Sequence, residues 1–118
     1  MQAGDRDSAS LWDMAQAIRR IQEFTANASS ETYLESVFMQ SAVERQLGIL
    51  GEASRRVSID FQQFHPEIDW RNAINLRNIL VHRYDQVRPE VIWNIVTSVW
   101  PSLLVQIEAL LPPLPDDI

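Results

Sequence analysis

The chain has 118 residues and contains neither cysteine nor lysine. Without cysteine it can form no disulfide and can offer no thiolate to a metal ion, which fits a reducing compartment. The start of the chain also lacks the basic end and apolar stretch of a signal peptide. We therefore expect a cytoplasmic protein. Because lysine is absent, every basic side chain is an arginine, whose planar guanidinium suits phosphate.

Long apolar runs, glycine-rich loops and metal ligands are also scarce. No apolar run approaches the ~20 residues that a membrane span needs, so no membrane segment is expected. Three glycines form no phosphate-binding loop. The two histidines, His65 and His82, have no cluster of acids near them, so we predict neither a metal site nor a cofactor. The length suits one domain, 1–118, with a flexible start at 1–7 and a proline-rich tail at 112–118.

Charge is distributed unevenly along the chain. The formal net charge of −6 argues against bulk electrostatic binding of nucleic acid, and DNA binding is not expected. Residues 71–88, however, carry four arginines and a single acid, whereas residues 89–118 carry four acids and no base. One short basic segment therefore lies in an acidic body. Chance and a general preference for arginine are the alternative explanation.

Helical periodicity dominates the sequence, and no strand is convincing. Apolar residues at helical spacing predict an all-α fold, an up-and-down bundle of four to five helices. Ser10 resembles the N-cap of the first helix, and Asp69 that of the third. Pro101 predicts a kink in the fourth. The long helices are expected at about 8–27, from 31 to 58 with a possible break near 36, at 70–83 and at 89–111, with a short helical turn at 61–65.

The fourth predicted helix bears on assembly. Its first apolar face holds Ile92, Ile95, Val99, Leu103 and Leu110, and an adjacent second face holds Trp93, Trp100, Leu104 and Leu111. A helix that is apolar over such a width is usually buried on two sides. A small monomer has too little interior to cover both faces, so we expect a homodimer. The alternative is that Trp93 and Trp100 cover the core of the monomer.

The segment with the most chemistry reads Arg-Asn-Ile-Leu-Val-His-Arg-Tyr and spans residues 77–84. His82 lies near a helix C-terminus, where the dipole favours the imidazolium form. Such a histidine could protonate a leaving 5′-oxygen or accept the proton of a 2′-hydroxyl, while Arg77 stabilises the charge on the phosphorane. RNA supplies its own nucleophile, so no metal is needed. The alternative for His82 is a half-buried structural histidine.

Helical projection separates the polar residues of this helix into two groups. Arg71, Asn75, Asn78 and His82 fall within a stripe about 60° wide, which is either a binding face or a solvated edge. Arg77 lies about 140° from His82, among apolar positions. A guanidinium there must be paired or must reach out to solvent, and the candidate partners are Glu52 and Glu44. If Arg77 is not so paired, a two-fold axis would bring two Arg–His pairs together.

Two aromatic residues flank the basic segment. Trp70 and Tyr84 could stack on bases. The alternative for Trp70 is an anchor in the core at the start of a helix, and the alternative for Tyr84 is a helix-end aromatic with its hydroxyl in water.

The motif R-x-x-x-x-H-x-Y at residues 77–84 resembles the signature of HEPN domains, specifically the HepT-like ribonuclease toxins. The segments at 42–45 and 50–53, the Trp70-Arg71 pair and residues 91–93 also resemble that family. The resemblance covers roughly residues 10–111. It implies a helical bundle that dimerises, a composite cleft where both Arg–His pairs meet, and metal-independent endoribonuclease activity that leaves a cyclic phosphate.

The resemblance also implies roles for individual residues and partners. Arg77 and His82 would be the catalytic pair, supported by Asn78, Glu52 and Arg71. Tyr84 would receive AMP from a partner nucleotidyltransferase antitoxin of the MntA type, which silences the toxin of a two-gene toxin–antitoxin system. One alternative is a non-catalytic module that docks such a nucleotidyltransferase, and another is a structural dimer in which Arg77 pairs with Glu52.

Overall fold

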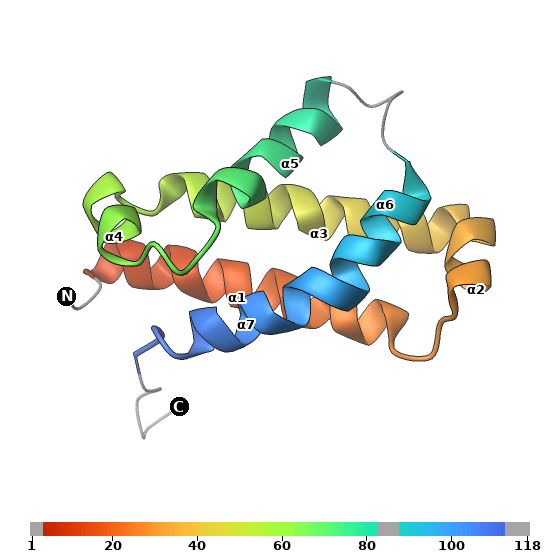
Figure 1. Ribbon diagram of the computed structural model, residues 1–118, viewed down its shortest axis with the longest axis horizontal. Coiled ribbons are helices and arrows are strands. Elements are labelled where there is room, and N and C mark those ends of the chain that lie inside the picture. The colour runs from red at the N-terminus through yellow and green to blue at the C-terminus, as the bar shows by residue number, and fades with distance from the viewer. Residues whose placement is uncertain (1–3, 83–87, 113–118) are drawn as a thin grey trace.

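The computed structural model describes residues 4–82 and 88–112, except the side chains of Leu76, Arg77 and residues 79–82. All regular structure in this part of the chain is helical (Figure 1), which confirms the all-α prediction. The elements in chain order are α1 (Asp5–Thr25), α2 (Ser30–Glu35), α3 (Val37–Arg56), α4 (Ile59–Phe64), α5 (Trp70–His82), α6 (Pro89–Asn94), the π-helix η2 (Ile95–Val99) and α7 (Trp100–Glu108).

Because α6, η2 and α7 form one continuous run, the described residues make six helices where four to five were predicted. The count reaches six because the chain breaks at Ser36 into α2 and α3, and because the short turn predicted at 61–65 is the helix α4. Ser29, Ser36 and Ser58 each accept a hydrogen bond from a backbone N–H three residues later, and so begin α2, α3 and α4. The break near Ser36 is confirmed.

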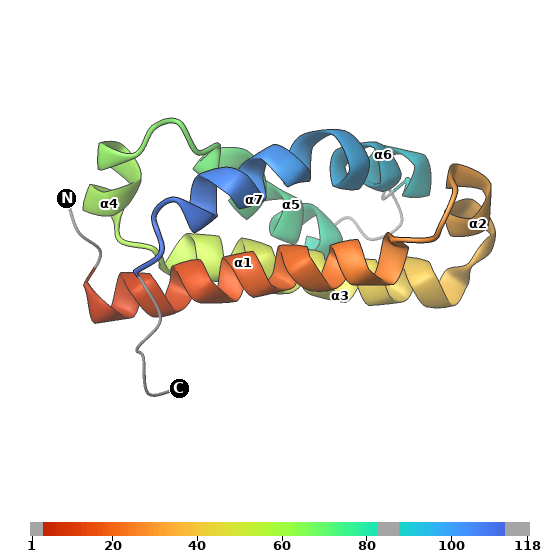
Figure 2. The same ribbon diagram turned by 90° about the horizontal axis from the view of Figure 1, so that it is seen from below.

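The core lies where α1 and α3 run side by side beneath the α6–η2–α7 run (Figure 2). The apolar stripes of the two long helices are fully buried: Leu11, Met14, Ile18 and Ile21 on α1, and Val43, Leu47 and Leu50 on α3. The start of α1 differs from the prediction, since Ser10 is buried inside the helix and the N-cap is Gly4. Asp5 and Asp7 in the first turn favour this earlier start through the helix dipole.

A buried carboxylate joins the start of the chain to α4. Asp7 is 9% exposed, and its two oxygens accept hydrogen bonds from the backbone N–H and the hydroxyl of Ser58, both at 2.8 Å. The same Ser58 hydroxyl oxygen caps α4 by accepting from the Phe61 N–H. One side chain of α1 thus fixes the turn that leads from α3 into α4.

The final helical run contains a π turn where a proline kink was predicted. The Trp100 N–H donates to the carbonyl of Ile95, five residues earlier, and Pro101 follows directly. A proline ring clashes with the carbonyl four residues before it, here that of Thr97. The Thr97 hydroxyl donates to the Trp93 carbonyl at 2.9 Å. The extra residue of the π turn therefore accommodates Pro101 without ending the helix.

The two apolar faces of this run are covered to different extents. Trp100 and Leu104 of the predicted second face are buried within the chain, and Trp93 is half-buried against Tyr33. The alternative reading, in which these tryptophans cover the core of the monomer, is therefore confirmed for Trp100. Large apolar side chains that remain exposed on this run are Val91, Val99 and Val105.

By length and composition alone, the run Pro89–Glu108 could cross a membrane, with a mean hydropathy of 1.2. The core helix of a soluble protein passes the same test, and here Ile92, Val96, Leu103 and Ile107 pack into the shared core. This packing accounts for part of the apolar character of the run, 33% of which is buried.

Candidate active site

Helix α5 carries most of the predicted site residues, and its start is firmly anchored. Asp69 accepts hydrogen bonds from the backbone N–H of Asn72 at 3.2 Å and from its side-chain amide at 2.6 Å, which confirms the predicted cap. Trp70 is 7% exposed, and its indole N–H donates to the His65 carbonyl at 3.0 Å. Its ring meets that of Phe61 edge-on at 6.4 Å. Trp70 is therefore a core anchor, as the alternative interpretation proposed.

The polar stripe of α5 is exposed over the part that the structure describes. Arg71, Asn75 and Asn78 are all exposed, as a binding face or a solvated edge requires. The backbone of α5 continues through position 82, so His82 follows Asn78 on the same face by helical spacing. The His82 side chain lies outside the described residues.

Arg77 occupies a different side of the same helix. By helical spacing its position falls about 20° from that of the buried Trp70 and about 40° from that of Ala73, which is 6% exposed. Helix α5 packs against α3, where the predicted partners Glu52 and Glu44 lie. The Arg77 side chain, and with it the predicted ion pair, lies outside the described residues. So do Tyr84 and its hydroxyl.

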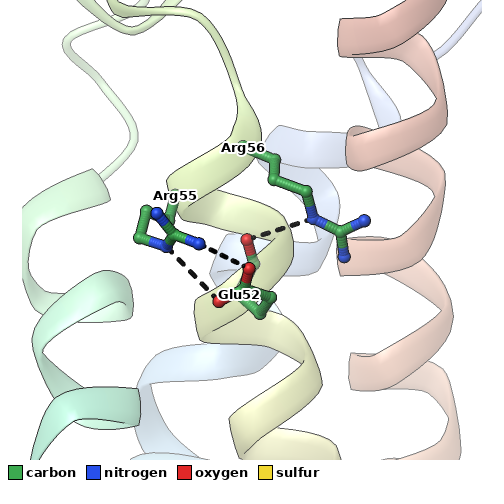
Figure 3. A network of polar contacts seen from close by, with 3 residues as sticks. All are labelled: Glu52, Arg55 and Arg56. Atoms are coloured by element: carbon green, nitrogen blue, oxygen red, sulfur yellow. Dashed lines mark hydrogen bonds and ion pairs between the residues drawn. The ribbon is translucent and has the colours of Figure 1, made fainter.

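Glu52 lies on the C-terminal half of α3 and belongs to a small polar network (Figure 3). Its carboxylate accepts hydrogen bonds from Arg55, at 2.7 Å to Nη2 and 3.3 Å to Nε. Its backbone carbonyl accepts from the Arg56 Nε at 3.5 Å. The carboxylate is 31% exposed. Two arginines of the same helix thus already donate hydrogen bonds to Glu52, and these bonds would orient its side chain beside α5.

Glu44, the other predicted partner of Arg77, is half-buried on α3. Burial raises the pKa of its carboxyl above the ordinary value. The nearby Tyr33 of α2 is fully buried, and its hydroxyl has no hydrogen-bond partner among the described residues. Burial, with a smaller contribution from the Glu44 charge, raises the pKa of Tyr33 to about 12. Burial therefore favours the neutral form of both the Glu44 carboxyl and the Tyr33 phenol.

A pocket of about 460 Å³ lies between the first half of α5 and the η2–α7 segment. Its apolar lining includes Ala73, Trp100 and Leu103, and its polar lining includes Asn75 and Ser102. Sequence reasoning did not single out Ser102 or the pocket, because the pocket depends on how α7 approaches α5. The one available signal was the polar stripe of α5, to which Asn75 belongs. Among the described residues, no group of three or more His, Asp or Glu side chains could hold a metal ion.

Comparison with known proteins places the chain in a family. Residues 14–110 match the family model described as "Ribonuclease HepT-like". A protein of Thermococcus cleftensis named "Probable ribonuclease HepT" is 42% identical over 100 residues, which cover 85% of this chain and 91% of the relative.

Two proteins of Methanocaldococcus jannaschii are also similar. "Putative RNase MJ1380" is 32% identical over 100 residues, covering 85% of this chain and 92% of the relative. "Putative RNase MJ0127" is 31% identical over 103 residues, covering 87% of this chain and 85% of the relative. No solved structure matches the chain. The matched residues include both α5 and the segment 77–84, and the chain belongs to the HepT-like ribonuclease family.

Proposed function

We propose that this protein is a metal-independent endoribonuclease, the toxin of a cytoplasmic HepT/MntA-like toxin–antitoxin system. The observation that carries the proposal is the family match over residues 14–110, which includes the segment 77–84 with its arginine, histidine and tyrosine. The exposed stripe of α5 supports it, because Arg71 and Asn78 lie on the face that leads to position 82. The ribonuclease names of the relatives agree with RNA as the substrate.

In the proposed reaction the 2′-oxygen of RNA attacks the adjacent phosphorus. The bond from the 2′-oxygen to phosphorus forms, the bond from phosphorus to the 5′-oxygen breaks, and a 2′,3′-cyclic phosphate remains. One imidazole accepts the 2′-hydroxyl proton and another protonates the leaving 5′-oxygen. Arg77 stabilises the charge that builds on the non-bridging oxygens. Asn78, Glu52 and Arg71 support this arrangement.

Each chain brings one imidazole of the segment 77–84, that of His82, so the proposed active form with two such imidazoles is a homodimer with a composite cleft. The positions of Arg77 and His82 differ by about 140° on the helix, so one helix does not readily aim both at one phosphate. A two-fold axis supplies the second pair. The exposed apolar residues Val91, Val99 and Val105 on the α6–η2–α7 run agree with a further interface on this protein.

Control of the enzyme would act through Tyr84. A partner nucleotidyltransferase antitoxin of the MntA type would transfer AMP from ATP to the phenol oxygen and release pyrophosphate. The added phosphate is anionic and the nucleotide is bulky, so it would both exclude RNA and offset the basic charge of residues 71–88.

The test is cleavage of RNA by the purified protein in the presence of EDTA, with the product ends analysed for cyclic phosphate. We expect cleavage by the wild type and none by His82→Ala. The matched control is His65→Asn, which changes the other histidine and should keep the activity if its circular dichroism is that of the wild type. Cleavage that persists in His82→Ala would refute the proposed site.

A second candidate function is a non-catalytic module that docks the nucleotidyltransferase. It is favoured by an apolar patch at the junction of α2 and α3, where Phe38 is 86% exposed, Val37 75% and Leu34 42%. This function predicts no RNA cleavage but tight association with the partner, lost in Phe38→Glu. Cleavage that depends on His82 would exclude it as the sole function.

A further inference from the structure

We propose that the pocket between α5 and the η2–α7 segment receives one base of the RNA, beside the nucleotide that is cleaved. This inference rests on the proposed function only in taking RNA as the ligand. It adds a specificity site to the chain, formed by residues that are distinct from the Arg77–His82 pair.

The size and lining of the pocket suit a base. Its volume of about 460 Å³ lies within the range of about 300 to 1,000 Å³ that is usual for small-ligand pockets. Ala73, Trp100 and Leu103 provide apolar surface, and each is less than a tenth exposed. The π turn contributes Ile95 and Val99. A flat, largely apolar ring can therefore bury its faces here.

Hydrogen-bonding groups on the rim are available to a ligand. The Asn75 amide and the Ser102 hydroxyl line the pocket, and neither has a hydrogen bond to any residue in the described part of the chain. Asn72 donates its amide N–H to Asp69, which leaves its amide oxygen as an acceptor. A purely apolar occupant, such as a leucine side chain of a second protein, would bury these groups without partners at a cost. The edge of a base can satisfy them.

The charges around the pocket favour the neutral part of a nucleotide. Glu67 and Asp69 lie on its lining and would repel a phosphate. Their carboxylates can accept hydrogen bonds from N–H groups on a base edge, of which guanine presents the most and uracil the fewest. The phosphate would instead lie toward Arg71, an exposed arginine of α5. The acidic side chains of the pocket and this arginine thus match the two parts of a nucleotide.

The helical register connects the pocket with the proposed scissile site. Asn75 and His82 are seven residues apart, so their positions share one face of α5 within about 20° and lie about 10 Å apart along the axis. This separation is within reach of a neighbouring nucleotide in an extended strand. The pocket is therefore placed to select a base at one fixed offset from the cleaved bond.

The experiment compares cleavage sites in a pool of oligoribonucleotides with random sequence, mapped by sequencing. We expect the wild type to enrich guanine over uracil at one offset. Asn75→Leu, which removes the amide, and Ser102→Trp, which fills the pocket, should each reduce this enrichment about tenfold, the size of one hydrogen bond. Gln16→Leu on α1 and Ser41→Trp on α3 are matched controls at exposed positions outside the pocket, and should keep the enrichment.

A second measurement does not depend on cleavage. Titration with guanosine 5′-monophosphate should shift the NMR signals of the Asn75 side-chain amide, and uridine 5′-monophosphate should shift them less. If the wild type cleaves no RNA but these shifts occur, the proposed function fails and the pocket assignment stands. If cleavage depends on His82 but Ser102→Trp keeps the wild-type base preference, the pocket assignment fails alone.

The same variants also test whether the groove is an interface between two copies of the chain. If Ser102→Trp converts a dimer into a monomer, as judged by light scattering, and guanosine 5′-monophosphate leaves the Asn75 amide unshifted, the groove holds the second copy. That result would overturn the proposal.

Discussion

The rings of Tyr33 and Trp93 lie 5.1 Å apart between centroids and are tilted by 32°, which joins the short helix α2 to α6. The phenol is completely buried, yet its hydroxyl has no hydrogen-bond partner in the part of the chain that the structure describes. A buried hydroxyl without a partner costs roughly 1–3 kcal/mol. The ring contact therefore stabilises the fold, whereas the hydroxyl at its end opposes it.

We predict that Tyr33→Phe raises the free energy of unfolding by about 1 kcal/mol, because it keeps the ring and removes the unpaired hydroxyl. Urea denaturation at pH 7 measures the change. Tyr33→Leu is the control, since it also removes the ring contact and should destabilise the protein. A loss of stability in Tyr33→Phe would mean that the hydroxyl has a favourable interaction.

The same residue predicts a dependence of stability on alkaline pH. The pKa of Tyr33 is raised to about 12 in the folded chain, against about 10 for an exposed tyrosine. Between these pH values the unfolded chain loses the Tyr33 proton before the folded chain does. The contribution of the protonated phenol to stability is therefore complete below pH 10 and is lost as pH rises to 12. The loss is up to about 1.4 kcal/mol per pH unit. Tyr33→Phe should show a shallower fall over this window.

The two hydrogen bonds from Ser58 to Asp7 predict a large effect of a single carboxylate. Asp7→Ala should lower the free energy of unfolding by about 2 kcal/mol, because it removes two charge-assisted bonds from a buried site. Chemical denaturation measures the loss. Asp13→Ala changes an exposed acid on the same helix and should stay within about 0.5 kcal/mol of the wild type. Equal effects of the two substitutions would contradict the assigned role.

Gly48 offers a stabilising substitution in the middle of α3. A Cβ atom added there would meet no described atom within 4 Å beyond its chain neighbours and the backbone of its own helix. We expect Gly48→Ala to raise the free energy of unfolding by about 1 kcal/mol, the difference in helix propensity. Gly4→Ala is the matched control, because the N-cap position of α1 brings no such gain. A loss of stability in Gly48→Ala, seen in the same denaturation experiment, would indicate a close contact at this position.

Arg71 should contribute to RNA affinity if the exposed stripe of α5 binds phosphate. In that case Arg71→Ala weakens binding and reduces the slope of log affinity against log salt by about 1. Fluorescence anisotropy with an RNA that carries 2′-fluoro groups, and so cannot be cleaved, measures both quantities. Arg20→Ala removes an exposed arginine on α1 and should leave the slope unchanged. An unchanged slope in Arg71→Ala would place the RNA elsewhere.

The long helices could be predicted from the sequence because their apolar stripes repeat at helical spacing and are buried as expected. The Asp69 cap and the break at Ser36 were also predictable, since capping depends on local residues. The number of helices was underestimated by one, although the break at Ser36 and the short turn at 61–65 were both expected. The sequence left open whether Trp100 faces a second copy or the core of the monomer, because its burial depends on contacts with α1 and other distant segments.

The candidate site was predictable to the extent that it lies on one helix. The exposed positions of Arg71, Asn75 and Asn78 follow from the helical period alone. The pocket did not follow, because Trp100 and Ser102 come from a helix whose approach to α5 depends on the π turn. The roles of Arg77 and His82 were inferred from their chemistry and from the resemblance, and that of Tyr84 from the resemblance alone. The side chains of all three lie outside the described residues.

The π turn at Ile95–Val99 determines how this helical run would respond to the deletion of a residue. It holds one more residue than a regular helix needs, so deletion of a single residue here could leave an unbroken α-helix. The π turn already takes up the rotation of one residue, so Leu103 and Ile107 would still face the core, but the Pro101 ring would meet the carbonyl four residues before it. In this protein a shorter, more regular helix would be the less stable one.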